Sequence, residues 1–158
     1  MNKLALIGKI IKALRSELET YVRAANSSHE EATAEENRAE NKYDTRGLEA
    51  SYLATGQANK VMELEEAIGA FEDLKAKSFD ESTIDIGALV ELDQNGGKAF
   101  YFIGPNAGGT EITDGVHKAV VITPQSPLGT QLQGQQQGDR LEITLAGSKQ
   151  PIQIVNVC

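Results

Sequence analysis

Three acidic side chains in the middle of the chain have a spacing that would let them act together. Glu36, Glu40 and Asp44 follow one another at i, i+4 and i+8, so on a helix they would share one face. Carboxylate oxygens are hard ligands that suit a divalent cation. The same acids could instead form ordinary i,i+4 ion pairs with bases nearby. The neighbouring bases are Arg38, Lys42 and Arg46. Both interpretations, a functional acidic site and a solvated charged face, stay open.

Other residue types that catalyse reactions or bind metals lack partners. His29 and His117 are isolated, with no metal-ligand partners at useful spacing. No Ser-His-Asp or Cys-His arrangement is present, and we interpret Cys158 as a bystander rather than a reactive thiol. The glycine-rich segment 103–110 lacks the Gly-Lys-Ser/Thr ending of a phosphate-binding loop. It is predicted to connect two strands.

The charge balance of the 158 residues excludes one class of function. The net charge is −8, and the pI is about 4.8. Nonspecific binding to a nucleic acid backbone needs a basic surface, so this chain is expected to act through a protein partner. The single cysteine favours a reducing cytoplasm. No stretch approaches the roughly 18 apolar residues of a membrane span, and no signal peptide is recognisable, so no membrane association is expected.

The composition changes sharply between two halves of the chain. The first 79 residues hold 25 of the 38 charged side chains, whereas all four prolines lie after residue 104. Eleven of the fifteen glycines lie from Gly87 onward. We place the boundary within 77–83, which predicts a helical domain over residues 1–79 and a β-rich domain over residues 80–158.

Two apolar series with a seven-residue repeat predict two long helices in the first half. The first series is Leu4, Ile7, Ile11, Leu14, Leu18, Tyr21 and Ala25. The second is Ala50, Ala54, Gln57, Val61, Leu64, Ile68 and Phe71. With no proline between them, the series predict helices over roughly 3–40 and 46–76 that face each other as an antiparallel hairpin. One long helix that dimerises is the structural alternative. Residues 29–46 would form a polar distal end, with the turn placed only to within about four residues.

The second half alternates as strands do. Segments 88–92 and 98–103 flank Asn95-Gly96, whose residue types suit a tight hairpin turn. Further strands are predicted over 116–123, 141–145 and 152–157. Ser126 is a good N-cap and Pro127 suits a first helical position, which predicts a short helix between the strands at 116–123 and 141–145. The fold class is therefore α+β, an N-terminal helical hairpin followed by a small antiparallel sheet with one short helix.

The order of elements and residues from position 121 onward identifies a fold family more specifically than the single strands and helix do. A strand at 121–123 leads to Ser126-Pro127-Leu128-Gly129, a helix, then Gly138-Asp139 and another strand. This order resembles the C-terminal domain of the Gre transcript-cleavage factors of bacteria, which has an FKBP-like fold. Segments 14–18 and 60–65 are similar to the helices of that family more coarsely.

The resemblance implies a function and a partner. In that family the hairpin enters the secondary channel of RNA polymerase, where its tip helps to hold a shared Mg²⁺ and the polymerase itself cleaves backtracked RNA. The chain would then be a transcription elongation factor and not an enzyme, with no cofactor of its own. The tip candidates are Glu36, Glu40, Asn41 and Asp44. The family pattern has Asp, then Glu three residues later, then Asn, and this sequence departs from it, so a non-cleaving or inhibitory regulator is an alternative.

The resemblance also implies a polymerase-docking loop at Ser126, Pro127, Leu128 and Gly129. A plain N-cap with Leu128 in the core would explain the same residues, and both can hold. Two further alternatives belong to other classes: an FKBP-like isomerase or chaperone, and a coiled-coil protein that oligomerises. The Gre-type interpretation predicts a monomer.

Overall fold

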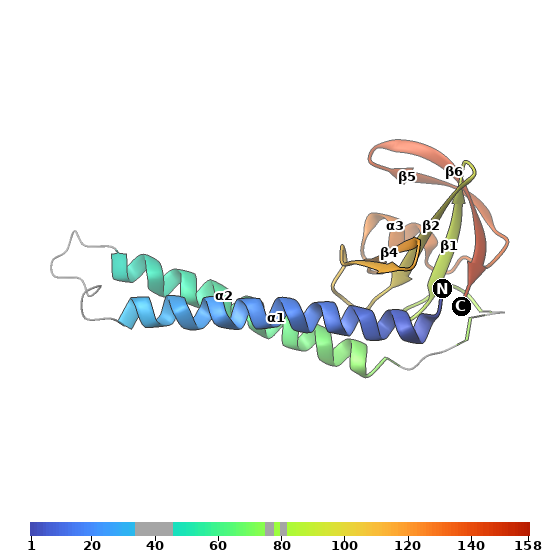
Figure 1. The fold of residues 1–158 in the computed structure, drawn as a ribbon. Coiled ribbons are helices and arrows are strands. Elements are labelled where there is room, and N and C mark those ends of the chain that lie inside the picture. Colours follow the sequence, from blue (N-terminus) through green and yellow to red (C-terminus); the bar gives the residue numbers. More distant parts are fainter. Residues whose placement is uncertain (34–45, 75–77, 80–81) are drawn as a thin grey trace. The chain divides into compact units, whose positions relative to one another are not determined.

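The computed structural model describes residues 1–33, 46–74, 78–79 and 82–158. Its elements are α1 (Lys3–Thr33), α2 (Arg46–Glu72), β1 (Leu89–Gln94), β2 (Gly97–Ile103), β3 (Glu111–Asp114), β4 (His117–Ile122), α3 (Pro127–Leu132), β5 (Arg140–Leu145) and β6 (Ser148–Val157) (Figure 1). They form two compact units, one of Met1–Ile11 with Ala70–Cys158 and one of Lys12–Gly69. The domain limits expected from composition, 1–79 and 80–158, stay a prediction.

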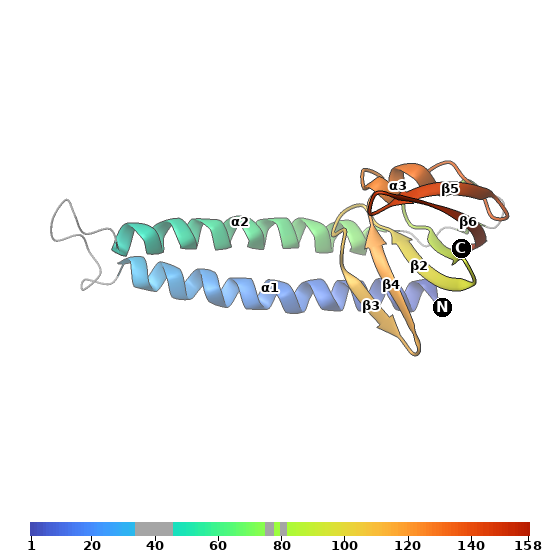
Figure 2. The same ribbon diagram turned by 90° about the horizontal axis from the view of Figure 1, so that it is seen from above.

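α1 and α2 run side by side in opposite directions in both Figure 1 and Figure 2, and the second unit, Lys12–Gly69, holds most of both helices. α1 begins at Lys3 because Asn2 caps it: the Asn2 Oδ1 accepts a hydrogen bond from the Ala5 N–H (3.0 Å). Between the helices, the Lys60 ammonium lies 5.9 Å from the ring centroid of Tyr21. The predicted helix pair is confirmed. Within the described residues, no helix has the length and apolar character needed to cross a membrane.

The apolar seams are confirmed in their middle and wrong at one end. Leu14, Leu64 and Ile68 are buried, as both series predict. Leu4, by contrast, is 66% exposed, because the buried stripe of α1 is centred on Leu6, Ile7 and Ile10, and a 3.6-residue helix turns Leu4 away from it.

The predicted ends of the helices fare differently. α2 ends at Glu72 and not near residue 76 as predicted, since the Leu74 N–H donates to the Phe71 carbonyl, an i→i+3 bond that closes the last turn. The predicted end of the first helix, near residue 40, and the turn lie outside the described residues.

The β-rich part is one six-stranded sheet with the order β3-β4-β2-β1-β6-β5. Every pair is antiparallel except β2 and β4, which run parallel. The predicted strands and the short helix α3 are confirmed, so the α+β fold class stands. β3 was not predicted: it lies between the predicted connection at 103–110 and the predicted strand at 116–123.

Two tight turns fix the register of the hairpins. Asn95 (φ 55°) and Gly96 (φ 85°) join β1 to β2, as predicted, with Gln94 paired to Gly97. Ala146 (φ 47°) and Gly147 (φ 81°) join β5 to β6 in the same way. Positive φ at both central residues defines the turn type that matches strand twist, but alanine tolerates it poorly.

Both faces of the sheet carry buried apolar side chains. One face packs on α3, with Leu128 and Leu132 among its buried cluster. On the other face, the ring of Phe71 lies 6.1 Å from that of Phe102, which is fully buried. Phe71 belongs to α2, and the buried Leu6, Ile7 and Ile10 of α1 belong to the same unit. We call residues 3–11 and 70–72 the helix roots, since they complete this second layer.

Each edge strand of the sheet has a side chain bonded to its backbone. At β3, the Lys9 Nζ donates to the Thr113 carbonyl (3.1 Å) and to the Asp114 Oδ1 (2.9 Å). At β5, the Thr144 N–H donates to the Gln131 Oε1 (2.7 Å), and the Gln131 Nε2 donates to the Thr144 carbonyl (3.3 Å). Such contacts occupy groups that would otherwise invite another strand.

Replacing Ala146 with Gly should stabilise the protein. An L-residue with positive φ loses roughly 1 kcal/mol, which glycine avoids, so Ala146→Gly should raise the free energy of unfolding by about 0.5 kcal/mol after its larger unfolded-state entropy is counted. Urea unfolding followed by circular dichroism measures the change. The control is Ala99→Gly in β2, which should lower the free energy by about 0.5–1 kcal/mol. Equal loss in both variants would contradict the turn geometry.

The Lys9–Asp114 pair should make stability depend on pH. The hydrogen bond from Lys9, and then its charge, lower the pKa of Asp114 from its ordinary 3.8. The folded state therefore favours the carboxylate, and the contribution is present above pH 3.8 and is lost as the pH falls through the lowered value. Asp114→Asn should be less stable than wild type at neutral pH, and the difference should shrink in acid. Lys9→Met, the control, removes the other partner of the pair, and its loss of stability should depend on pH in the same way as that of Asp114→Asn. A stability difference from wild type that is constant with pH would contradict the assignment of the pair.

Candidate functional site

The loop before α3 is built by hydrogen bonds of Ser126. Its Oγ accepts from the Gly129 N–H (3.0 Å) and donates to the Thr123 carbonyl (2.7 Å). Pro127 occupies the first helical position, where no N–H is needed. The Thr130 hydroxyl donates to the Ser126 carbonyl (3.0 Å) and the Pro124 carbonyl (3.1 Å). The predicted N-cap is confirmed, and the loop is held in one conformation from within.

The four predicted docking residues differ in exposure. Leu128 and Gly129 are buried, Ser126 is half-buried, and Pro127 is exposed. The interpretation of Leu128 as a core residue is confirmed. Gly129 cannot carry a side chain, because a Cβ there would stand 1.9 Å from the Thr123 carbonyl oxygen. Pro127 is therefore the only one of the four that is fully exposed, and the docking role of all four stays a prediction.

Gln131 is a residue of this site that sequence reasoning missed. Besides its two bonds to Thr144, its Nε2 donates to the Pro127 carbonyl (2.7 Å). The carboxamide thus links the first turn of α3 to the backbone of β5. No local pattern in the sequence predicts the contact between Gln131 and Thr144, since these two residues lie 13 positions apart.

The acidic tip predicted from the sequence lies outside the described residues. It comprises Glu36, Glu40, Asn41 and Asp44. Their role in helping to hold a metal ion stays a prediction. Among the residues that the structure does describe, no group of three His, Cys, Asp or Glu side chains is placed to hold a metal ion.

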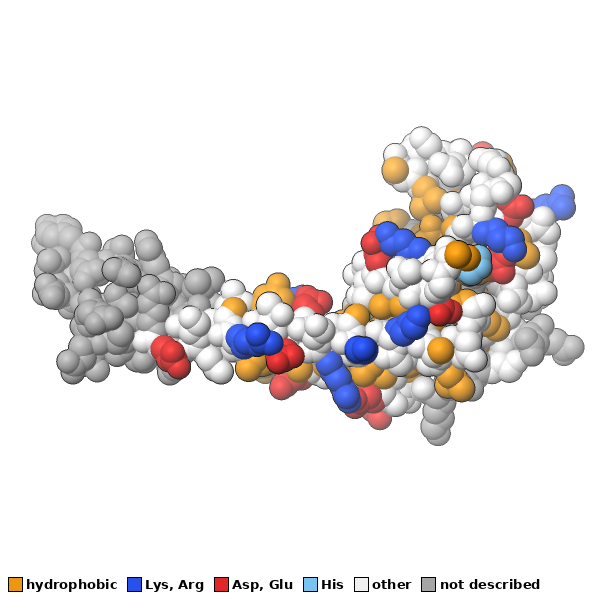
Figure 3. Space-filling view, in the orientation of Figure 1, with side chains coloured by type: hydrophobic (Ala, Val, Ile, Leu, Met, Phe, Trp, Pro, Cys, Tyr) orange, Lys and Arg blue, Asp and Glu red, His pale blue; other side chains and the backbone are white. Residues whose placement is uncertain are grey.

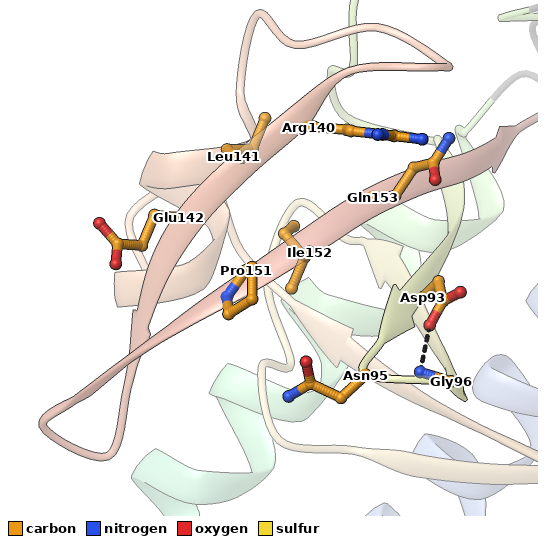
Figure 4. Close-up of a pocket in the computed structure, with 9 residues that line it drawn as sticks. All are labelled: Asp93, Asn95, Gly96, Arg140, Leu141, Glu142, Pro151, Ile152 and Gln153. Atoms are coloured by element: carbon orange, nitrogen blue, oxygen red, sulfur yellow. Dashed lines mark hydrogen bonds between the residues drawn. The ribbon is translucent and has the colours of Figure 1, made fainter.

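A shallow hollow of about 530 Å³ lies on three adjacent strands, β1, β6 and β5 (Figure 4). Its polar row comes from register: Gln153 of β6 pairs with Asp93 on one side and with Arg140 on the other. Asp93 also accepts a hydrogen bond from the Gly96 N–H (2.7 Å). The full lining is Asp93, Asn95, Gly96, Arg140, Leu141, Glu142, Pro151, Ile152 and Gln153. It offers charged and amide groups, but no serine, threonine, cysteine, lysine or histidine and no aromatic ring.

Charged side chains on the face shown in Figure 3 are interspersed by sign. Lys98 pairs with Glu91 (2.8 Å) and Lys60 approaches Glu63 (3.7 Å). The Glu91 carboxylate raises the pKa of Lys98, through a hydrogen bond first and its charge second. Among the described residues of this face there is no continuous basic stripe of the kind that tracks a nucleic acid backbone.

Comparison with solved structures finds similar chains. GreA factor homolog 1 (Gfh1) of Thermus thermophilus is 21% identical with a TM-score of 0.40, covering 94% of both chains. Thermus aquaticus Gfh1 is 20% identical with a TM-score of 0.40, covering 98% of this chain and 92% of that one. The prokaryotic transcription elongation factor GreA/GreB from Nitrosomonas europaea is 18% identical with a TM-score of 0.36, covering 73% and 94%. No family model and no curated protein matches the chain. At these values the likeness assigns no function.

Substitutions in the loop should distinguish the capping role of Ser126 from the close backbone packing at Gly129. Ser126→Ala removes the capping oxygen and should lower the free energy of unfolding by about 1 kcal/mol. Gly129→Ala should cost more, because its Cβ has no space and backbone must move. The control is Gly8→Ala in α1, where nothing lies within 4 Å of the new Cβ, and which should stabilise by about 1 kcal/mol. Thermal unfolding measures all three, and a mild Gly129→Ala would contradict the packing.

Proposed function

We propose that the protein is a bacterial RNA polymerase-binding elongation factor of the Gre type, and not itself an enzyme. The observation that carries the proposal is the Ser126-Pro127-Leu128-Gly129 loop, whose order of strand, capped loop, short helix and strand resembles that family. The α+β fold found here, a helix pair followed by a sheet with one short helix, is the arrangement that the resemblance implies.

The helix pair supports the proposal by its length. α1 has 31 residues and α2 has 27, so the described helices are about 45 Å and about 40 Å long at the rise of an α-helix. A helix pair of this length can hold the side chains at one of its ends far from those at its other end. That is what a factor acting inside a narrow channel requires.

The acidic residues between the helices are the proposed acting groups. In the secondary channel, Glu40 and Asp44 would supply oxygen ligands to a Mg²⁺ that the polymerase holds, and the polymerase would cleave the RNA. Because Glu40-Asn41 and Asp44 depart from the family's order of acids, the same binding can instead inhibit cleavage. The two outcomes share one partner and one site, and one experiment separates them.

The hollow on β5 and β6 weighs against a prolyl isomerase. A proline-binding site needs aromatic walls, and this hollow has none. Of the three aromatic side chains at positions 100–102, Phe100 and Phe102 are buried and Tyr101 is half-buried against the core cluster, so they form no open aromatic wall. The fold alone does not assign such an activity.

The tip can be tested with Glu40→Ala combined with Asp44→Ala. Backtracked elongation complexes are incubated with the wild type or with the double variant, and RNA cleavage is followed on gels. We expect the variant to bind polymerase within about twofold of wild type, because the proposed docking loop is unchanged, and to lose any effect on cleavage.

The matched control is Glu63→Ala combined with Glu65→Ala, which removes two exposed acids of α2. It should keep the full effect on cleavage. Stimulation by the wild type identifies an activating tip, and suppression of intrinsic cleavage an inhibitory one. An equal effect of wild type and double variant would show that the tip residues are misassigned, and no affinity of wild type for polymerase would end the proposal.

A further inference from the structure

β5 is the last strand of the sheet, and only one of its two edges is paired (Figure 1). The Ile154 N–H of β6 donates to the Asp139 carbonyl (2.9 Å), which fixes the residues whose backbone faces β6. In an antiparallel pair this facing alternates from residue to residue, so the backbone groups of Arg140, Glu142 and Thr144 point away from β6. These three residues therefore present their N–H and C=O groups to the outer edge of the sheet.

Gln131 occupies the backbone of only one of these three residues. Its carboxamide bonds to both the N–H and the C=O of Thr144. Within the described part of the chain, the backbone N–H and C=O groups of Arg140 and Glu142 have no hydrogen-bond partner. Unpaired backbone groups on an edge strand are a template for another strand. We call residues 140–142 the β5 edge, which is open to strand addition.

The side chains of the β5 edge carry opposite charges on one face of the sheet. Arg140 and Glu142 are exposed and lie two residues apart, so they point to the same side. Leu141, between them, points to the other side and packs against the core cluster. Within its own chain Glu142 meets the Lys149 ammonium at 3.8 Å, and both side chains are more than half exposed, so this pair is weak. Charges of one sign would repel a second copy, whereas two opposite signs can attract it.

We propose that the β5 edge is an interface with a second copy of this chain. In a twofold antiparallel pairing centred on Leu141, Arg140 lies opposite Glu142 of the second copy, and Glu142 lies opposite the arginine of that copy. Each opposed pair exchanges both of its backbone N–H···O=C bonds and adds an ion pair on one face of the sheet. The two Leu141 side chains meet on the other face. This inference does not depend on the proposed function, because the β5 edge shares no residue with the loop or the acidic tip.

Charge and Gln131 together select this register over its neighbours. A shift in one direction places Arg140 opposite the same residue of the second copy, and like charges directly opposite destabilise a sheet. A shift in the other direction places Glu142 opposite its own copy and needs the backbone of Thr144, which Gln131 already holds. So short an interface is well below the roughly 1,200 Å² of a stable complex, so the dimer should form only at high concentration. The monomer that the resemblance predicts then holds at low concentration.

Charge reversal on the β5 edge tests the pairing. Sedimentation velocity of the full chain at low salt, over roughly 10 µM to 1 mM, should show a wild-type dimer with a Kd on the order of 100 µM. Arg140→Glu alone and Glu142→Arg alone should each weaken the dimer at least about tenfold, because both opposed pairs become like-charged. An equimolar mixture of the two variants should regain the wild-type affinity, since each glutamate then faces an arginine. The control Glu111→Arg makes the same charge change on the other edge strand, β3, and should dimerise as wild type does.

Glu142→Pro and Glu142→Gln separate the backbone contribution from the charge. Both lack the carboxylate, but proline also lacks the outward N–H, and the pairing with β6 is kept because that N–H faces away from β6. Glu142→Gln should weaken the dimer about threefold, whereas Glu142→Pro should leave only monomer. Circular dichroism checks that all variants keep the fold. Equal dimerisation of the proline and glutamine variants would overturn the backbone pairing.

The other outcomes are equally decisive. A wild type that stays monomeric at the highest concentration overturns the inference. Single variants that dimerise as wild type does also overturn it, and they would assign the association to another surface, such as the helix pair. Monomeric single variants whose mixture stays monomeric would overturn the proposed register. Polymerase binding is measured separately, and none of these outcomes alters the test of the proposed function.

Discussion

Phe71 of α2 packs against Phe102 of β2, and this contact joins a helix root to the sheet. Without it, the face of the sheet opposite α3 would expose Phe102, Val121 and Ala119 to water, each now almost fully buried. Burying one phenylalanine contributes roughly 1.5–3 kcal/mol, a large share of the marginal stability of a small domain. The sheet can carry apolar residues on both faces only because the helix roots cover the second one.

Local signals account for what could be predicted. Asn95-Gly96 determines its hairpin because few residues accept positive φ at two successive positions, and this holds wherever the turn sits in the fold. Ser126 and Pro127 determine the start of α3 by capping and by ring geometry, which likewise need no tertiary partner. The seven-residue repeat predicts helices because apolar side chains spaced by three and four residues form one buried stripe on a helix, and this spacing recurs along the chain.

The parts that escaped prediction depend on distant partners. β3 is only four residues long and is held by β4 and by Lys9, so no alternation marks it. Leu4 was assigned to the seam because the repeat continues to it, although burial near the end of α1 follows the helix roots instead. Of the candidate site, the conformation of the loop could be read from Ser126 and Pro127. The contact of Gln131 could not, because its partner is backbone and any residue type except proline at position 144 would supply both groups.

The division into units has a consequence for how the chain folds. The unit that contains the sheet is discontinuous, with Met1–Ile11 and Ala70–Cys158 separated by the helix pair in the chain. Its second layer forms only after the ends of a long insertion are brought together, and that closure entropy must be met before Phe71 reaches Phe102. A stable helix pair shortens the search by joining those ends early. The helix pair would then form first and the sheet second. A fragment that contains only the residues after α2 would keep its strands but would lack the helix roots that cover one face of the sheet.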